Sequence, residues 1–228
     1  MRYDPKFLSD DLKRFKSVQN AELLVGGLSR PSKMPWLGWS ISAKQCRTGG
    51  ALAKVEGSVC HGCYALKGRY VFPNVQSALN RRQACSETAI FVPAFIFLLR
   101  EKAKKVNVER RFFRWFDSGD LQNLDMLYNL NLIALNVPEV QFWLPTKEKG
   151  IVREFLKETK FSPNLTVRVS APMIDAVPRT DLTVGSAVFK IKIPTGAQPC
   201  PAPSQGNACV DCRSCWDNTV KLVAYHIH

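Results

Sequence analysis

The sequence is poor in histidine and has no long apolar segment. Only three histidines occur among the 228 residues, which argues against a cysteine or serine nucleophile activated by a histidine. No P-loop, GxSxG or HExxH motif is present. The longest apolar run covers about residues 89–99, too short to cross a bilayer. The first residues form no apolar signal segment. We therefore expect no membrane segment and a reducing, cytoplasmic environment.

Acidic side chains are in the minority. Lysine and arginine number 32 against 19 aspartates and glutamates, a formal net charge of +13. Such a charge indicates a polyanionic partner, and nucleic acid is the first candidate. The basic residues are scattered, however, and no long basic run occurs. The alternative interpretation is therefore a surface of solvated lysines and arginines.

The chain contains neither an internal repeat nor a low-complexity tract. Its length suits a single domain over residues 1–228. Within that domain we expect an outer N-terminal segment over 1–35, a βα core over 36–195 and a cysteine-rich C-terminal segment over 196–228.

Strand and helix patterns alternate through the core. Aromatic and β-branched runs predict strands at 36–42, 112–116, 140–144 (ended by Pro145), 165–170 and 186–191. Helical periodicity predicts helices after Asn74 and at 86–105, 124–135 and 151–159. This alternation is typical of an α/β fold with parallel strands. We expect a partial (βα) barrel or an open parallel sheet, with the C-terminal cysteine-rich segment closing a metal site.

Seven of the eight cysteines fall in two groups: Cys46, Cys60 and Cys63, and Cys200, Cys209, Cys212 and Cys215. The second group has CxxCxxC spacing and a cysteine followed by proline, as in the ligand run of a ferredoxin-type iron–sulfur site. In a reducing compartment, clustered cysteines favour metal binding over disulfides. We therefore predict one [4Fe–4S] cluster held between the two groups.

The ligand set is open at this stage. The strongest candidates are Cys209, Cys212 and Cys215, and the fourth ligand comes from Cys200, Cys60 or Cys63. Two ligands from each group, or two separate clusters, are alternatives. Zinc is the competing metal, because CxxC pairs from each group could supply four thiolates.

Two further cysteines are less clear in role. Cys46 lies in a Gly-rich loop and is either a ligand or a free thiol. Cys85 lies in helical sequence and has no partner at useful spacing, so we expect a buried free cysteine there.

The cysteine motifs resemble a known family. The segment Cys60-His61-Gly62-Cys63-Tyr64-Ala65-Leu66-Lys67-Gly68-Arg69-Tyr70 and the later CxxCxxCW run resemble those of the bacteriophage family called Gene product 88, over roughly residues 35–225. The resemblance implies a phage-encoded, cluster-binding protein in the cytoplasm of a bacterial host. It implies no particular reaction.

The first cysteine segment is also similar to that of radical S-adenosylmethionine proteins. That similarity implies a cluster with one open iron, and S-adenosylmethionine bound by a loop such as Asp117-Ser118-Gly119-Asp120. The usual CxxxCxxC spacing is absent, since thirteen residues separate Cys46 from Cys60. The alternative for the loop is a turn in which Asp120 caps a helix beginning near Leu121.

Other polar residues near the motifs have simpler interpretations. Lys67 and Arg69 would neutralise the charge of a thiolate-bound cluster. We expect His61 to be exposed, and His226 and His228 to belong to a mobile tail.

Two functions follow. The first is an iron–sulfur protein for electron transfer or radical-type chemistry, with an electron donor or host protein as partner. An open iron would favour an enzyme, and complete ligation a carrier. The alternative is a metal-stapled module that binds nucleic acid or a host protein.

Overall fold

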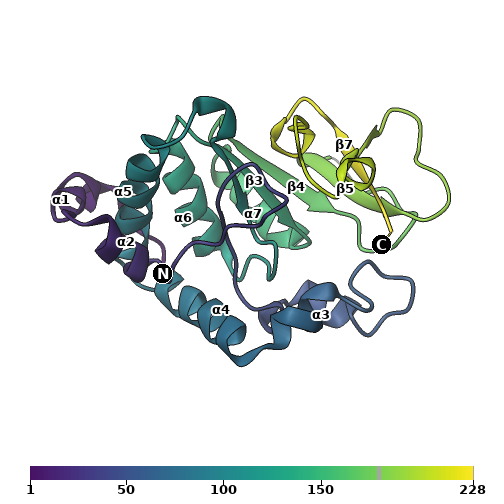
Figure 1. Ribbon diagram of the computed structural model, residues 1–228, viewed down its shortest axis with the longest axis horizontal. Helices are drawn as coiled ribbons and strands as arrows, with labels where there is room; N and C mark the ends of the chain where they lie inside the picture. The colour runs from purple at the N-terminus through teal and green to yellow at the C-terminus, as the bar shows by residue number, and fades with distance from the viewer. Residues whose placement is uncertain (179–180, 228) are drawn as a thin grey trace.

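The computed structural model describes residues 1–178 and 181–227 and contains an open sheet of seven strands (Figure 1). The order across the sheet is β1-β2-β3-β4-β5-β7-β6, and every pairing is parallel. The expected α/β class with an open parallel sheet is confirmed. The strands are β1 (Gly38–Trp39), β2 (Phe112–Trp115), β3 (Gln141–Thr146), β4 (Leu165–Ser170), β5 (Val184–Phe189), β6 (Gln198–Pro199) and β7 (Leu222–His226).

The α-helices connect the strands or precede them. They are α1 (Leu8–Lys13), α2 (Val18–Leu24), α3 (Thr48–Leu52), α4 (Pro73–Ser86), α5 (Phe91–Ala103), α6 (Leu124–Leu135) and α7 (Lys149–Glu158). The predicted bounds of α6 and β4 are confirmed. The helix predicted at 86–105 begins later, at Phe91. The strand predicted to end before Pro145 continues to Thr146, because pairing with β4 extends to that residue.

One face of the sheet packs on helices. Successive strand residues point to opposite faces, and on β3 and β4 the apolar side chains of Phe142, Leu144 and Val167 join the main core. That core also contains the buried faces of α5, α6 and α7. Parallel strands covered in this way are rich in apolar residues on the covered face.

The opposite face is covered by the C-terminal segment. Trp143 of β3 packs there with Trp216 and Val223 in a separate apolar cluster. The same segment contributes β6 and β7, so the sheet extends beyond the predicted 36–195 core. His226 is the last residue of β7, and its assignment to a mobile tail is wrong. His228 lies outside the described residues.

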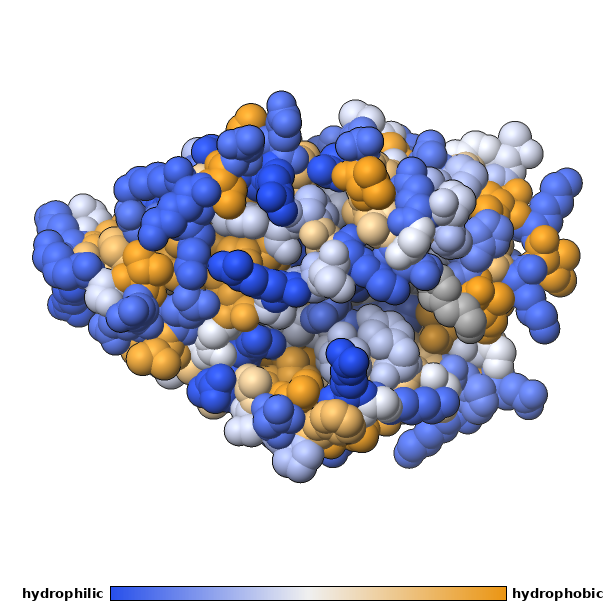
Figure 2. Space-filling model, viewed as in Figure 1, coloured by the Kyte–Doolittle hydropathy of each residue, from blue (hydrophilic) through white to orange (hydrophobic). Residues whose placement is uncertain are grey.

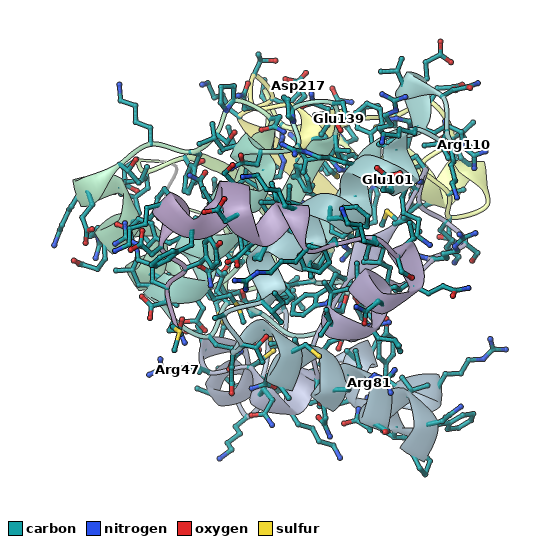
Figure 3. The ribbon with its side chains drawn as sticks, turned by 90° about the vertical axis from the view of Figure 1, so that its left-hand side faces the viewer. Arg47, Arg81, Glu101, Arg110, Glu139 and Asp217 are labelled. Atoms are coloured by element: carbon teal, nitrogen blue, oxygen red, sulfur yellow. The ribbon has the colours of Figure 1, made fainter. Side chains whose placement is uncertain are left out.

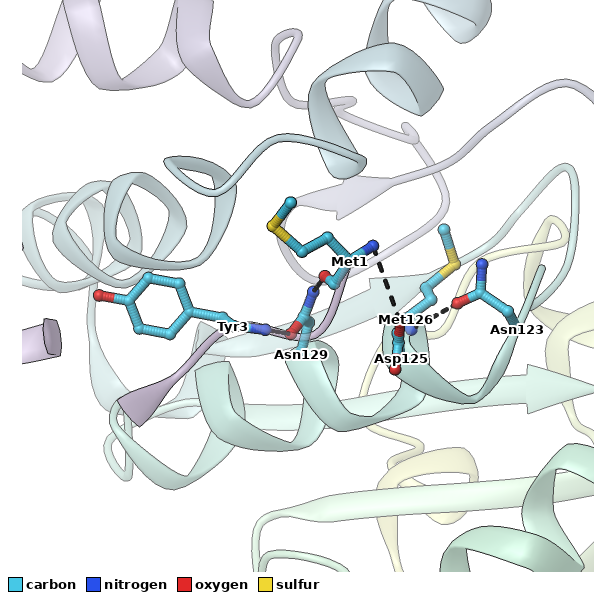
Figure 4. Close-up of polar contacts among 6 residues, drawn as sticks. All are labelled: Met1, Tyr3, Asn123, Asp125, Met126 and Asn129. Atoms are coloured by element: carbon cyan, nitrogen blue, oxygen red, sulfur yellow. Dashed lines mark hydrogen bonds and ion pairs between the residues drawn. The ribbon is translucent and has the colours of Figure 1, made fainter. Parts of the chain in front are cut away.

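The N-terminus is held by α6 (Figure 4). Asn129 accepts a hydrogen bond from the Tyr3 amide at 2.8 Å and donates to the Met1 carbonyl at 2.9 Å. The terminal ammonium lies 3.9 Å from the Asp125 carboxylate. These contacts, with the packing of α1 and α2 against α5, fix the first residues on the outside of the helical layer.

Hydrophilic side chains cover most of the face shown in Figure 2, with apolar patches between them. Within the described part of the chain, no single helix is long and apolar enough to cross a membrane. The pair α4 and α5 meets the length and composition criteria only together, and the two helices are bent by 114° relative to each other.

Candidate metal centre

The loop after β1 carries the first cysteine group, which we define as Cys46, Cys60 and Cys63. The carboxyl ends of parallel strands lie at one edge of the sheet, where ligand sites gather. The loop crosses that edge. The Val59 amide donates to the Pro172 carbonyl at 2.9 Å, and the Ile174 amide donates to the Gly57 carbonyl at 3.0 Å. The first cysteine group is thereby tied to the segment that follows β4.

The thiols of this group lie near one another. A Cβ atom placed on Gly49 would lie 3.2 Å from the Cys46 Cβ and 3.5 Å from the Cys60 Sγ. Burial raises the pKa of Cys46 to about 12, and the charges of Asp120, Cys63 and Cys60 add to the shift. Without a metal, this thiol is therefore protonated at neutral pH.

Lys147 is the cation beside these thiols. Its ammonium donates to the Ala171 carbonyl at 3.1 Å. Burial lowers the pKa of Lys147, while the charges of Cys60, Asp120, Cys63 and Cys46 act in the opposite direction. The cation is thus positioned to offset negative charge on the first cysteine group.

The loop Asp117-Ser118-Gly119-Asp120 follows β2 at the same edge. Gly119 has φ +81°, and a Cβ on it would lie 2.8 Å from the Ile41 carbonyl oxygen, so only glycine permits this close approach. Ser118 donates to the same carbonyl at 2.9 Å. The loop is therefore packed directly on the segment after β1.

Both carboxylates of this loop are bound within the chain. Asp120 accepts from the Leu121 amide at 2.7 Å, the Thr146 hydroxyl at 2.6 Å and the Lys147 amide at 2.8 Å. Burial nevertheless raises the pKa of Asp120 to about 6. Asp117 accepts from Ser40 and, at 3.1 Å, from the Tyr70 hydroxyl.

The expected helix cap at Asp120 is wrong. The helix begins at Leu124, and its cap is Asn123, whose Oδ1 accepts from the Met126 amide at 2.8 Å (Figure 4). Binding of S-adenosylmethionine by the Asp117–Asp120 loop stays a prediction.

The C-terminal cysteine group, which we define as Cys200, Cys209, Cys212 and Cys215, lies over the sheet face opposite the helices. Burial raises the pKa of Cys209, and the charges of Cys200 and Cys212 raise it further. Burial also raises the pKa of Cys215 to about 12, with smaller raising contributions from Cys200 and Cys209. All four thiols therefore lie within range of one another's charge.

Polar and apolar side chains surround this group. The Cys215 Sγ lies 3.1 Å from the Tyr225 hydroxyl, and the Cys209 Sγ lies 3.9 Å from the Met34 sulfur. Cys215 itself is 7% exposed. The site combines soft sulfur donors with a partly desolvated setting.

Arg168 of β4 holds the backbone of this segment. Its guanidinium donates to the carbonyls of Cys215 at 3.0 Å, Ser214 at 2.6 Å and Asp217 at 2.6 Å. Two more bonds reach the carbonyls of Gly185 at 3.0 Å and Val220 at 2.9 Å. The side chain is 0% exposed, and burial lowers its pKa.

Arg114 of β2 is a second guanidinium near the same thiols. It stacks on Trp143 at 4.6 Å. Burial acts to lower the pKa of Arg114, but the charges of Tyr64, Asp117, Tyr225 and Cys215 outweigh it and the pKa is raised. Its Nε has no hydrogen-bond partner among the described residues.

Arg114 and Arg168 were not predicted. The available signal was a charged residue inside an otherwise apolar strand, as in Val167-Arg168-Val169.

The two cysteine groups lie apart. Arg47, next to Cys46, and Asp217, beyond Cys215, are at opposite ends of the view in Figure 3, and Figure 1 separates α3 from the C-terminal segment in the same way. The expectation of one centre between both groups therefore does not match this arrangement. The alternative in which Cys200 completes the C-terminal group does.

All eight cysteines are free thiols. Within residues 1–178 and 181–227, no group of three or more His, Cys, Asp or Glu side chains is placed so that it could hold a metal ion. Cys85 is half-buried, with its Sγ 3.8 Å from the Leu23 carbonyl oxygen, rather than fully buried as expected. His61 is exposed, as expected.

A family model described as Gene product 88 matches residues 13–218. No curated protein and no solved structure matches the chain. The family match covers most of the sequence and contains both cysteine groups. The chain therefore belongs to the Gene product 88 family, a family of phage gene products.

Proposed function

We propose that this chain is an iron–sulfur protein whose C-terminal cysteine group holds a [4Fe–4S] cluster for electron transfer. Four cysteines are the usual ligand set of such a cluster. The thiols would draw closer together on binding, which the short loops between them allow. The cluster, when bound, would supply a one-electron redox couple.

The charge around the group is the observation that carries the proposal. A buried guanidinium without a counter-charge is costly by several kcal/mol. In the part of the chain that the structure describes, no salt bridge joins Arg168 or Arg114 to a carboxylate. Thiolates of the C-terminal cysteine group, together with an anionic cluster, would supply the missing negative charge.

The chain's own residues would set the properties of the cluster. Arg168 would fix the carbonyls of the ligand loop, and the Tyr225 hydroxyl would donate to the Cys215 sulfur. Hydrogen bonds to sulfur and nearby positive charge tune the reduction potential of such clusters. Four protein ligands leave no iron open, so electron transfer rather than substrate binding suits this site.

The test is anaerobic purification followed by iron, sulfide and zinc analysis and visible absorption. We expect a charge-transfer band and acid-labile sulfide in the wild-type protein, and their loss from this site in Cys212→Ser. Cys85→Ser is the matched control, because Cys85 lies outside both groups, and it should load as wild type. Zinc without sulfide, or no metal at the site, would contradict the proposal.

The cellular setting follows from the family. A phage protein with reduced, clustered cysteines would act in the cytoplasm of a bacterial host, where an electron donor or host protein would be its partner. Cleavage of added S-adenosylmethionine by the reduced protein would instead assign radical chemistry and contradict a pure carrier role.

A further inference from the structure

A second set of thiols lies outside the proposed electron-transfer site. The first cysteine group occupies the carboxyl edge of the sheet, on the loop between β1 and α4. In open parallel sheets this edge is where small-molecule ligands bind. The question is what three thiols, rather than four, would do there.

We propose that Cys46, Cys60 and Cys63 hold a second [4Fe–4S] cluster, with one iron left open for a small anionic ligand. The inference rests on the proposed function only in that the chain is loaded with iron–sulfur clusters. It assigns this site a binding role, whereas the C-terminal site carries electrons.

The backbone around these thiols leaves room for a bound group. Gly49 of α3 faces the sulfurs, and a side chain there would occupy the space beside Cys46 and Cys60, at 3.2 Å from the Cys46 Cβ. The next residue, Gly50, has nothing within 4 Å of an added Cβ. Of this adjacent pair, only Gly49 lies against the cysteines.

The neighbouring acids are not available as a fourth ligand. Glu148 accepts from the Thr48 amide and hydroxyl, each at 2.9 Å. The Asp120 carboxylate accepts three hydrogen bonds and is buried. His61 is exposed. Among the described residues, the site therefore offers three thiols and no free fourth donor, which leaves one iron open.

The class of ligand follows from the neighbouring charge and space. The Lys147 ammonium lies beside the three thiols and is held by the Ala171 carbonyl at 3.1 Å. It would pair with an anionic donor, such as a carboxylate, bound at the open iron. A cavity of about 560 Å³, lined in part by Arg47, Thr48 and Glu148, adjoins the loop and is large enough for a small molecule.

The first experiment counts iron in the full-length protein after anaerobic reconstitution. We expect about eight irons per chain in wild type and in Cys85→Ser, and about four in Cys60→Ser and in Cys212→Ser. Four irons in wild type that Cys60→Ser retains in full would overturn the second cluster. Full iron content in Cys212→Ser would instead overturn the proposed electron-transfer site, so the two failures are distinguishable.

A matched glycine pair guards against variants that merely misfold. Gly49→Val should halve the iron content, since the new side chain fills the space beside the thiols, whereas Gly50→Val should leave it unchanged. Both changes lie in the same helix, so an equal loss in the two variants would contradict the proposed location.

The open iron has its own readout. Ferricyanide should remove one electron from the cluster, which then releases Fe²⁺ and gives a [3Fe–4S] EPR signal, in wild type and in Cys212→Ser but not in Cys60→Ser. Cyanide, a small anion that binds open iron, should change the EPR spectrum of reduced Cys212→Ser. No [3Fe–4S] signal and no response to cyanide would show complete ligation and overturn the proposal.

Discussion

At the scale of single residues, Arg168 links the sheet to the cysteine-rich segment. Its five hydrogen bonds reach carbonyls on two strands' ends and on the loop that carries Cys215. Arg168→Gln cannot reproduce them, and it leaves buried carbonyls without donors. We expect the free energy of unfolding to fall by about 3 kcal/mol or more, measured by urea denaturation.

The control for this change is an exposed arginine of the same chain. Arg81 lies on the solvent side of α4, and Arg81→Gln should alter the free energy of unfolding by no more than about 0.5 kcal/mol. Similar losses in both variants would mean that Arg168 acts only through overall charge.

Asp120 makes stability depend on pH. Burial raises its pKa from 3.8 to about 6 in the folded protein. Its contribution is therefore fully present below pH 3.8 and is lost as the pH rises through about 6. From the shift we expect a loss of about 3 kcal/mol between pH 4 and 7.

The measurement is the free energy of unfolding across this pH range in wild type and in Asp120→Asn. The variant lacks the titrating group, so its curve should lose that slope, even though its amide disturbs the bonds from Lys147. An unchanged slope would assign the pH dependence to other groups.

At the scale of elements, the start of α6 depends on a cap. Asn123 accepts from the Met126 amide, one of the donors that the first helical turn leaves unpaired. Asn123→Ala should lower stability by about 1 kcal/mol, whereas Asn123→Ser should retain most of it, because serine also caps. Thermal unfolding distinguishes them, and equal losses in both would indicate that the position matters for another reason.

Element bounds were predictable where local signals agreed. The α6 periodicity and the β-branched run of β4 gave the observed bounds. The end of β3 was not predictable, because pairing with β4 carries that strand through Pro145. β7 was missed for a similar reason: its short run beside the last histidines becomes a strand only by pairing with β5 and β6.

At the scale of the whole molecule, the two faces of the sheet differ in what stabilises them. The helical side has the large apolar core, whereas the C-terminal segment has smaller clusters and the cysteine ligands. Metal-binding free energy becomes folding free energy where ligands come from such a segment. Removal of the metal should therefore speed hydrogen exchange in β6 and β7 and leave α6 protected. Equal exchange with and without metal in β7 would contradict a stapling role.

The charge of the whole chain gives a separate prediction. A net charge of +13 favours contact with a polyanion, and such binding weakens steeply as salt displaces the counterion effect. We expect single-stranded DNA to bind the metal-loaded protein at low salt, with a dissociation constant that rises steadily as salt is added. Fluorescence anisotropy measures this, and absence of binding at low salt would exclude nucleic acid as the partner.

The sequence by itself determined the fold class and the candidate ligands. Strand and helix periods are local properties of the chain, and cysteine spacing within a loop limits which thiols can meet. These signals predicted an open parallel sheet and named the cysteines of both groups.

Only the tertiary structure decided which thiols lie together and what surrounds them. The C-terminal segment crosses the face of the sheet, so Cys200 lies with Cys209, Cys212 and Cys215, while Cys46 lies with Cys60 and Cys63 at the carboxyl edge. Arg168, Arg114 and Lys147 come from separate strands or their ends. Their positions depend on long-range pairing and on the path of the chain across the sheet, which no local pattern encodes.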